Sequence, residues 1–316
     1  MIKKLLLFVS LSLITFITAS AEGLEAVYGK VSNGYNYWLY TPEDTADENG
    51  KPLVIFLHGR SLCGSDLNKV RKYGTISAIE KGRKLDAYVI APQNPGGSWN
   101  PEKIMNIVEY VSEENNIDEN RIYVLGMSLG GYGAIDFAAA YPDRIAAAIG
   151  MCGGATKKDL SGLATMPLWI IHGTGDAAVP VSQSDKVVEA VKAAQTDGVN
   201  RLQYDRVPGM NHSKPARVFY HPDTYEWLFS HSLADEGRPM TPTFKINEEF
   251  FGSCYSNLNH SRGYKGSNSQ KATASKGKSK SKTTTASTKS TTKKSKSSSK
   301  TTASATSKKS TKKKGA

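Results

Sequence analysis

Short apolar runs alternate with amphipathic stretches between about residues 22 and 233. Five runs are continuously apolar or nearly so, and each stops at Gly, at Ala-Pro or at His-Gly; they cover 53–57, 87–90, 121–125, 145–149 and 168–171. Runs of this length are typical of strands buried on both faces of a parallel sheet. Residues 35–40 alternate in character and predict an exposed early strand, and 202–207 predict a last strand.

Helical patterns fill the spaces between these strands. The patterns cover 101–115, 129–141, 182–195 and 225–231. In the first of them Ile104, Ile107, Val108 and Val111 share one face, as in a helix that packs on a sheet. Strands that alternate with helices through short connections predict a doubly wound α/β sandwich, in which ligands bind beyond the carboxyl ends of the strands.

The first 21 residues have the pattern of a secretory signal peptide. Lys3 and Lys4 form a basic start, residues 5–17 are apolar, and Ala19-Ser20-Ala21 is a small-residue cleavage site. The alternative is a buried N-terminal helix. A signal peptide predicts a secreted or periplasmic protein, and no later segment is long and apolar enough to cross a bilayer.

The last 56 residues differ in composition from the rest of the chain. Residues 261–316 contain 16 Lys, one Arg and no acidic residue, within runs of Ser, Thr, Ala and Gly. Such a composition buries too little apolar surface to offset the entropy cost of ordering, so we expect a disordered tail. This stretch carries +17 of charge while the whole chain carries +12, so residues 1–260 carry −5. The predicted catalytic domain, residues 22–260, is therefore not basic. The tail is either an inert solvated terminus or a non-specific binder of polyanions.

The strongest chemical signal is Gly126-Met127-Ser128-Leu129-Gly130, a G-x-S-x-G motif. It lies between a predicted strand and a predicted helix, which is the context that a nucleophile elbow requires. The glycines allow a tight turn that presents the Ser128 hydroxyl at the sheet edge. A Gly-rich turn without chemistry is the alternative, and the flanking elements favour a nucleophile.

A serine nucleophile needs a base and an acid that orients the base, in the chain order Ser, acid, His for this kind of fold. Asp176 follows the strand at 168–171 in a Gly-rich loop and is the predicted acid. Asp185, inside the next helical pattern, is its rival. His212, in a turn-rich loop after the last strand, is the predicted base. The other histidines have simpler roles; His58 and His172, for example, each end a strand beside a Gly.

The tetrahedral intermediate of acyl transfer needs fixed hydrogen-bond donors. We expect one to be the backbone N–H of Leu129, directly after the nucleophile. The second is expected in the loop after the strand at 53–57, at Arg60 by position. The Arg60 side chain could instead meet an acidic or sugar group of the substrate, or simply lie on the surface.

Residues 51–233 resemble the α/β-hydrolase superfamily, and within it the phospholipase/carboxylesterase-like and predicted-peptidase group near the feruloyl and acetyl xylan esterases. The stretches that carry the resemblance are VIFLHGR, VIAPQNPGGSWN, IYVLGMSLGGYGAI, PLWIIHGTGDAAVP and VPGMNHS. The resemblance implies an α/β-hydrolase fold and ester hydrolysis through an acyl-enzyme without a cofactor. It also implies that Ser128, Asp176 and His212 are the triad.

Two further expectations concern the loops at the same edge. Related esterases often place an aromatic residue where Trp99 lies, so Trp99 is a candidate for substrate binding, with capping of the next helix as the alternative. Cys63 and Cys152 also follow strand ends, and either pair in a disulfide or remain two buried thiols. No CxxC or HExxH motif occurs, and we expect no metal site.

Three functions remain open from the sequence. The first is hydrolysis of carboxylic esters, such as acyl or feruloyl groups attached to polysaccharide. The second is a secreted serine peptidase of the same fold, although no gating domain is visible in the sequence. The third is a non-catalytic protein that binds anions through its tail, which the complete Ser, Asp and His set disfavours.

Overall fold

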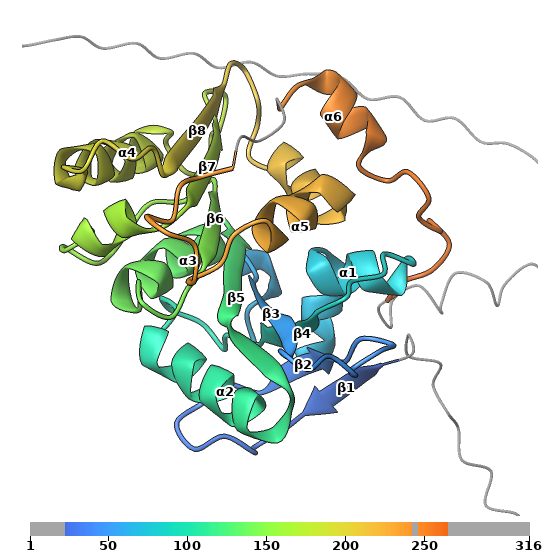
Figure 1. Cartoon of the computed structure of the whole chain (residues 1–316). Coiled ribbons are helices and arrows are strands. Elements are labelled where there is room, and N and C mark those ends of the chain that lie inside the picture. The colour runs from blue at the N-terminus through green and yellow to red at the C-terminus, as the bar shows by residue number, and fades with distance from the viewer. Residues whose placement is uncertain (1–22, 242–245, 265–316) are drawn as a thin grey trace, which may run out of the picture. The chain divides into compact units, whose positions relative to one another are not determined.

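The computed structural model describes residues 23–241 and 246–264, and these form an eight-stranded sheet flanked by helices (Figure 1). The strand order is β1-β2-β4-β3-β5-β6-β7-β8. The strands are β1 (Leu24–Val27), β2 (Tyr37–Tyr40), β3 (Lys51–Leu57), β4 (Tyr88–Pro92), β5 (Ile117–Met127), β6 (Ala147–Met151), β7 (Leu168–Gly173) and β8 (Leu202–Val207). Strands β4, β3, β5, β6, β7 and β8 are parallel, and β1 and β2 pair antiparallel at one edge. The predicted mostly parallel α/β sheet is thereby confirmed.

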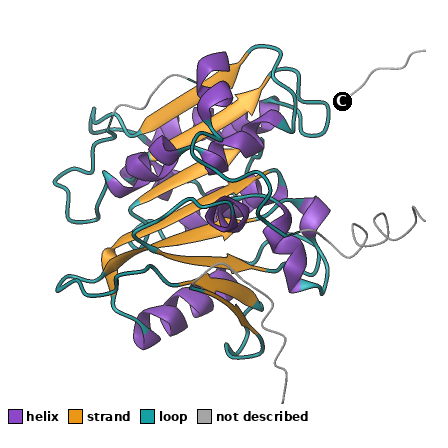
Figure 2. Cartoon of the chain, turned by 90° about the vertical axis from the view of Figure 1, so that its right-hand side faces the viewer, coloured by secondary structure: helices purple, strands orange, loops and turns teal. Residues whose placement is uncertain are grey.

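Helices cover both faces of this sheet (Figure 2). They are α1 (Thr75–Glu80), α2 (Pro101–Glu114), α3 (Leu129–Ala140), α4 (Ser182–Ala194), α5 (Pro222–Phe229) and α6 (Glu248–Ser253). Short 3-10 helices lie between them: η1 (Arg60–Leu62), η2 (Leu67–Lys72), η3 (Ser161–Thr165) and η4 (Lys214–Tyr220). Helices α1, α5 and α6 contribute to one hydrophobic core, and α2, α3 and α4 to the other.

Strand β3 shows why the central strands are apolar without alternation. Val54 and Phe56 belong to the core under α1 and α5, whereas Leu53, Ile55 and Leu57 belong to the core under α2 and α3. All five side chains are completely buried. Because successive side chains point to opposite faces, a strand covered by helices on both sides needs apolar residues at every position.

The structure corrects several details of the predicted elements. Strand β1 and helices α1 and α6 are short and were not predicted. Strand β2 is buried rather than exposed, since it lies between β1 and β4 and the Arg71 guanidinium covers Trp38. Helix α5 begins at Pro222 instead of residue 225, because proline suits a first turn and the His221 ring accepts the N–H of Asp223.

The described part of the structure does not include the predicted signal peptide or most of the predicted tail. Residues 1–21 and residues 265–316 lie outside the described residues. The boundaries at residues 22 and 260 therefore stay predictions.

Two glycines of the elbow are required by close contact with backbone atoms. A Cβ on Gly126 would lie 2.1 Å from the carbonyl oxygen of Gly130, and a Cβ on Gly130 would lie 1.9 Å from that of Leu57. Backbone atoms cannot move aside as a side chain can. Helix α3 therefore packs against the end of β3 at a distance that only glycine permits.

Replacing Gly130 with alanine should lower the free energy of unfolding by about 3 kcal/mol, because the added methyl group overpacks a site walled by backbone. Gly252 in α6 is the matched control: no atom lies within 4 Å of the position that a Cβ would take there, so Gly252→Ala should be neutral or stabilising. Urea unfolding of the two variants beside the wild type measures both effects. Equal stabilities for the two variants would contradict the close packing of α3 on β3.

Candidate active site

Ser128 lies in a strained turn between the end of β5 and the start of α3. Its φ is 59° and its ψ is −122°, a backbone conformation that costs about 1–3 kcal/mol for a residue with a side chain. The turn is held by the Ser128 N–H, which donates to the carbonyl of Met151 at 2.8 Å. The structure thus places this side chain where the G-x-S-x-G motif predicts it.

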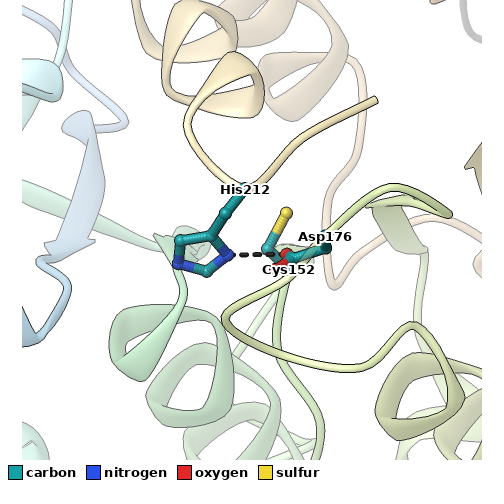
Figure 3. A group of neighbouring side chains, drawn as sticks. All are labelled: Cys152, Asp176 and His212. Atoms are coloured by element: carbon teal, nitrogen blue, oxygen red, sulfur yellow. Dashed lines mark hydrogen bonds and ion pairs between the residues drawn. The ribbon is translucent and has the colours of Figure 1, made fainter. Parts of the chain in front are cut away.

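A hydrogen-bonded chain links Ser128 to His212 and Asp176. The Ser128 Oγ is 2.9 Å from His212 Nε2, and His212 Nδ1 is 2.6 Å from Asp176 Oδ2. Figure 3 shows the second contact, with the imidazole ring turned edge-on to the carboxylate. A carboxylate can only accept, so the proton lies on Nδ1 and the lone pair of Nε2 faces the serine hydroxyl. In this tautomer Nε2 is oriented to accept the proton of the Ser128 hydroxyl.

Three hydrogen-bond donors hold the Asp176 carboxylate, which is buried in the loop after β7. The N–H groups of Ala178 and Val179 both donate to Oδ1 at 2.8 Å, and Nδ1 of His212 donates to Oδ2. Nε2 of His172 lies 3.3 Å from Oδ2 but is bonded to the carbonyl of Val179 at 3.0 Å. Burial alone would raise the pKa of this carboxyl. The hydrogen bonds from Val179, His212 and Ala178 outweigh burial and hold the pKa below its usual range. The carboxylate stays ionised next to the base.

The rival acid, Asp185, is engaged elsewhere. Its Oδ1 accepts hydrogen bonds from the Tyr204 hydroxyl at 2.7 Å and from Arg206 Nε at 3.1 Å. The buried His172 instead connects the Asp176 loop to α4, because its Nδ1 is 2.8 Å from the hydroxyl of Ser184. Both residues therefore have structural partners that do not include Ser128.

Cys152 is the third side chain beside Asp176 and His212. Its sulfur, one Asp176 oxygen and one His212 nitrogen all lie within 4.8 Å of one another (Figure 3). A metal ion could bridge atoms at this spacing, but the short bond between Asp176 and His212 already accounts for two of them. Burial, and then the nearby carboxylate, raise the pKa of the Cys152 thiol.

Cys63 and Cys152 are free thiols, so the alternative of a disulfide between them is wrong. The Cys152 side chain faces the Asp176 loop, whereas Cys63 follows η1.

The two residues expected to supply the oxyanion donors both line one cavity. Leu129 is the first residue of α3 and Arg60 the first of η1, and both line the same cavity as Ser128. Among the residues the structure describes, neither backbone N–H has a protein acceptor. Each is therefore available to an oxygen in the cavity.

The cavity has a volume of about 740 Å³ and opens over Ser128 and His212. Its walls are mainly apolar and aromatic, with hydroxyls near the nucleophile; they include Ser61, Tyr73, Leu129, Tyr132, Ala178, Val179 and Ala216. Sequence reasoning missed Tyr73, Tyr132 and Ala216, since none of them stands in a motif that marks a binding role. A cavity of this volume can hold a small-molecule ligand.

Trp99 does not line this cavity, and its predicted role in substrate binding is corrected. The side chain is only 4% exposed, its Nε1–H donates to the carbonyl of His58 at 3.3 Å, and its ring packs edge-on against Tyr35 and His58. Gly133 of α3 lies directly against the indole. Trp99 therefore packs in the hydrophobic core under α2 and α3.

His58 joins two loops at the strand ends. Its Nε2 accepts the N–H of Asn94 at 3.0 Å, and its Nδ1 lies 2.8 Å from the carbonyl of Gly59. Burial lowers the pKa of this completely buried ring to about 4. His58 therefore stays neutral in the folded protein at pH values where an unfolded chain would protonate it.

The free energy of unfolding should fall as the pH drops from about 6.5 to about 4, because His58 binds a proton in the unfolded state and not in the folded state over this range. The neutral His58 ring stabilises the folded state by about 3 kcal/mol, at 1.36 kcal/mol per pH unit of pKa difference, and this stabilisation is fully present above pH 6.5. Replacing His58 with glutamine should flatten this part of the profile by that amount. Urea unfolding at several pH values measures it, and parallel profiles for the two proteins would contradict the assignment.

Parts of this chain are similar to known proteins. The Phospholipase/Carboxylesterase family model matches residues 95–224, a range that includes Ser128, Asp176 and His212. A poly(3-hydroxyalkanoate) depolymerase C of Paucimonas lemoignei is 27% identical over 176 residues, which are 50% of this chain and 41% of that protein. An acetylxylan esterase A of Aspergillus ficuum is 26% identical over 136 residues, 38% of this chain and 43% of that protein. The chain thus spans less than half the length of these curated relatives.

The solved structure of a thermostable esterase superposes with a TM-score of 0.55 and 26% identity, over 67% of this chain and 64% of that one. This chain has the α/β-hydrolase fold. The predicted resemblance to α/β-hydrolase esterases is confirmed by the family model, the esterase relatives and the shared fold together. Within the described part of the chain, no helix has the length and apolar character that crossing a membrane would require.

Proposed function

We propose that this protein cleaves carboxylic esters through an acyl-enzyme formed on Ser128. The observation that carries the proposal is the hydrogen-bonded chain from Ser128 through His212 to Asp176, which opens on the cavity. The esterase relatives support ester chemistry over other reactions of the fold.

Each residue of the chain has a role in two successive steps. The Ser128 oxygen attacks the ester carbon while its proton passes to His212 Nε2, and the N–H groups of Leu129 and Arg60 stabilise the oxyanion. Collapse of the intermediate breaks the bond to the alcohol, which leaves with the proton from Nε2. Water then attacks the acyl-enzyme with His212 as base, which releases the acid and restores Ser128. Asp176 holds the imidazole in the required tautomer throughout.

The substrate we propose is an acyl or aryl ester attached to a polymer, such as acetyl or feruloyl groups on a polysaccharide. Among the relatives, one is named for acetylxylan and one for a polyester. The mostly apolar cavity would accept the acyl group, while the polymer remains outside. No cofactor enters these steps.

The location and the tail complete the proposal. A signal peptide at residues 1–21 would export the enzyme to the periplasm or the medium, where polymer substrates are found. The 16 Lys and one Arg of residues 261–316 would hold it non-specifically to polyanions.

A panel of substrates tests the reaction class. The full chain is assayed with p-nitrophenyl acetate, methyl ferulate, acetylated xylan and a peptide p-nitroanilide. Hydrolysis of esters with little or no cleavage of the anilide is expected, and the preferred ester identifies the acyl group. Cleavage of the anilide alone would overturn ester hydrolysis in favour of a peptidase.

A further inference from the structure

Tyr73 lines the cavity, and its phenol group has no role in the proposed steps. It follows η2, and its ring packs edge-on against Phe56, with centroids 6.3 Å apart, and lies near Phe219. These aromatic contacts come from the core under α1 and α5. The ring is therefore fixed from behind, while the residue lines the same cavity as Ser128.

The phenol oxygen is held in place by the loop that carries Arg60. The N–H of Gly59 donates to this oxygen at 2.8 Å, and the Ser61 side chain also forms a hydrogen bond with it. Since a backbone N–H can only donate, the phenol acts as acceptor toward Gly59 and retains its own proton for another partner. Besides Ser61, that partner can be a substrate oxygen in the cavity.

The phenol oxygen also lies close to the nucleophile. A point 2.7 Å from the Tyr73 oxygen, where a Cβ on Gly59 would stand, is 3.4 Å from the Ser128 Cβ. The Tyr73 oxygen and the Ser128 Cβ are therefore at most about 6 Å apart, the sum of these two distances. Burial raises the pKa of Tyr73, so the phenol keeps its proton at neutral pH.

We propose that the Tyr73 hydroxyl is a third hydrogen-bond donor to the oxyanion of the tetrahedral intermediate, beside the N–H groups of Arg60 and Leu129. The inference rests on the proposed ester hydrolysis at Ser128. The Gly59 N–H aims the phenol from one side, and the cavity side of its oxygen is left for the substrate. A fixed donor of this kind acts mainly on the transition state, because the charge on the oxygen develops there.

Tyr73→Phe in the full chain tests this role by removing the hydroxyl and keeping the ring. Loss of one oxyanion donor lowers kcat by roughly 10²-fold. We expect that fall for p-nitrophenyl acetate with KM within about twofold, since the substrate carbonyl carries little charge in the ground state. The affinity for an arylboronic acid, which forms a tetrahedral adduct with the serine, should fall in parallel with kcat/KM. Thermal unfolding confirms that the variant is folded.

Other results separate this inference from the reaction itself. If the wild type hydrolyses esters and binds the boronic acid, and Tyr73→Phe does both equally well, the third donor is wrong and the esterase stands. A rise in KM that matches the loss of activity would mean a displaced loop rather than a lost donor, and would also overturn the inference. If the wild type does neither, ester hydrolysis and the inference both fail.

Discussion

Replacing Ser128 with alanine should lower kcat for ester hydrolysis by about 10⁶-fold, to the level that binding and the oxyanion donors alone can supply. Ser128 Oγ is the atom that His212 Nε2 faces at 2.9 Å, and the strained turn presents it to the cavity. Alanine removes the nucleophile and fits the same turn as well as serine does. Release of p-nitrophenol from p-nitrophenyl acetate, with large amounts of enzyme for the variant, measures the loss.

The matched control is Ser161→Ala. Ser161 is exposed, begins η3, and bonds to Asp159 rather than to any residue of the cavity. Its replacement should leave kcat within about twofold. Surface substitutions of this kind change the free energy of unfolding by about 0.5 kcal/mol or less, so the variant should stay folded with its active site unchanged. If Ser128→Ala kept more than a small fraction of the activity, another group would have to be the nucleophile.

Replacing Asp176 with asparagine should lower kcat by about 10⁴-fold while the fold persists. An amide can present its NH₂ group to His212 Nδ1, which then becomes the acceptor, so that Nε2 carries the proton and cannot accept one from Ser128. The N–H groups of Ala178 and Val179 would still have the other oxygen to bind, and the loop would keep its shape. Steady-state kinetics and thermal unfolding of the variant separate the loss of function from a loss of structure.

Asp185→Asn is the control that tests the rival acid. Asp185 pairs with Tyr204 and Arg206, so its replacement should cost stability at the edge of the sheet and change kcat by no more than a few-fold. The opposite pattern, with activity lost in Asp185→Asn and kept in Asp176→Asn, would reassign the orienting acid.

The sequence was most informative where a residue is tied to the end of a central strand. Ser128 and Asp176 follow β5 and β7, whose apolar runs are visible without a structure, and His212 follows the last strand, β8. Because parallel strands bring their carboxyl ends to one edge, three residues far apart in sequence could be expected at a single site. The structure joins these three side chains in one hydrogen-bonded chain through His212.

The residues that sequence reasoning missed depend on packing between segments. Trp99 stands in a Gly-rich loop typical of a binding site, yet its indole is drawn under α3 by contacts with His58 and Gly133. Tyr73 stands in a segment without a motif, yet the loop at Gly59 brings its hydroxyl to the cavity. Neither contact involves near neighbours in sequence, so local patterns carry no trace of them. Helices α1 and α6, of six residues each, are too short for periodicity to reveal.

The measurement that tests the nucleophile most directly is to map the adduct of a fluorophosphonate, which reacts with an activated serine and stays attached. The full chain is treated with the reagent, digested and examined by mass spectrometry, with Ser128→Ala and Asp176→Asn treated in parallel. We expect a single adduct on Ser128, none on this peptide in Ser128→Ala, and much slower labelling in Asp176→Asn. An adduct on a different residue, or ester hydrolysis by a protein that takes up no label, would contradict a Ser128 acyl-enzyme.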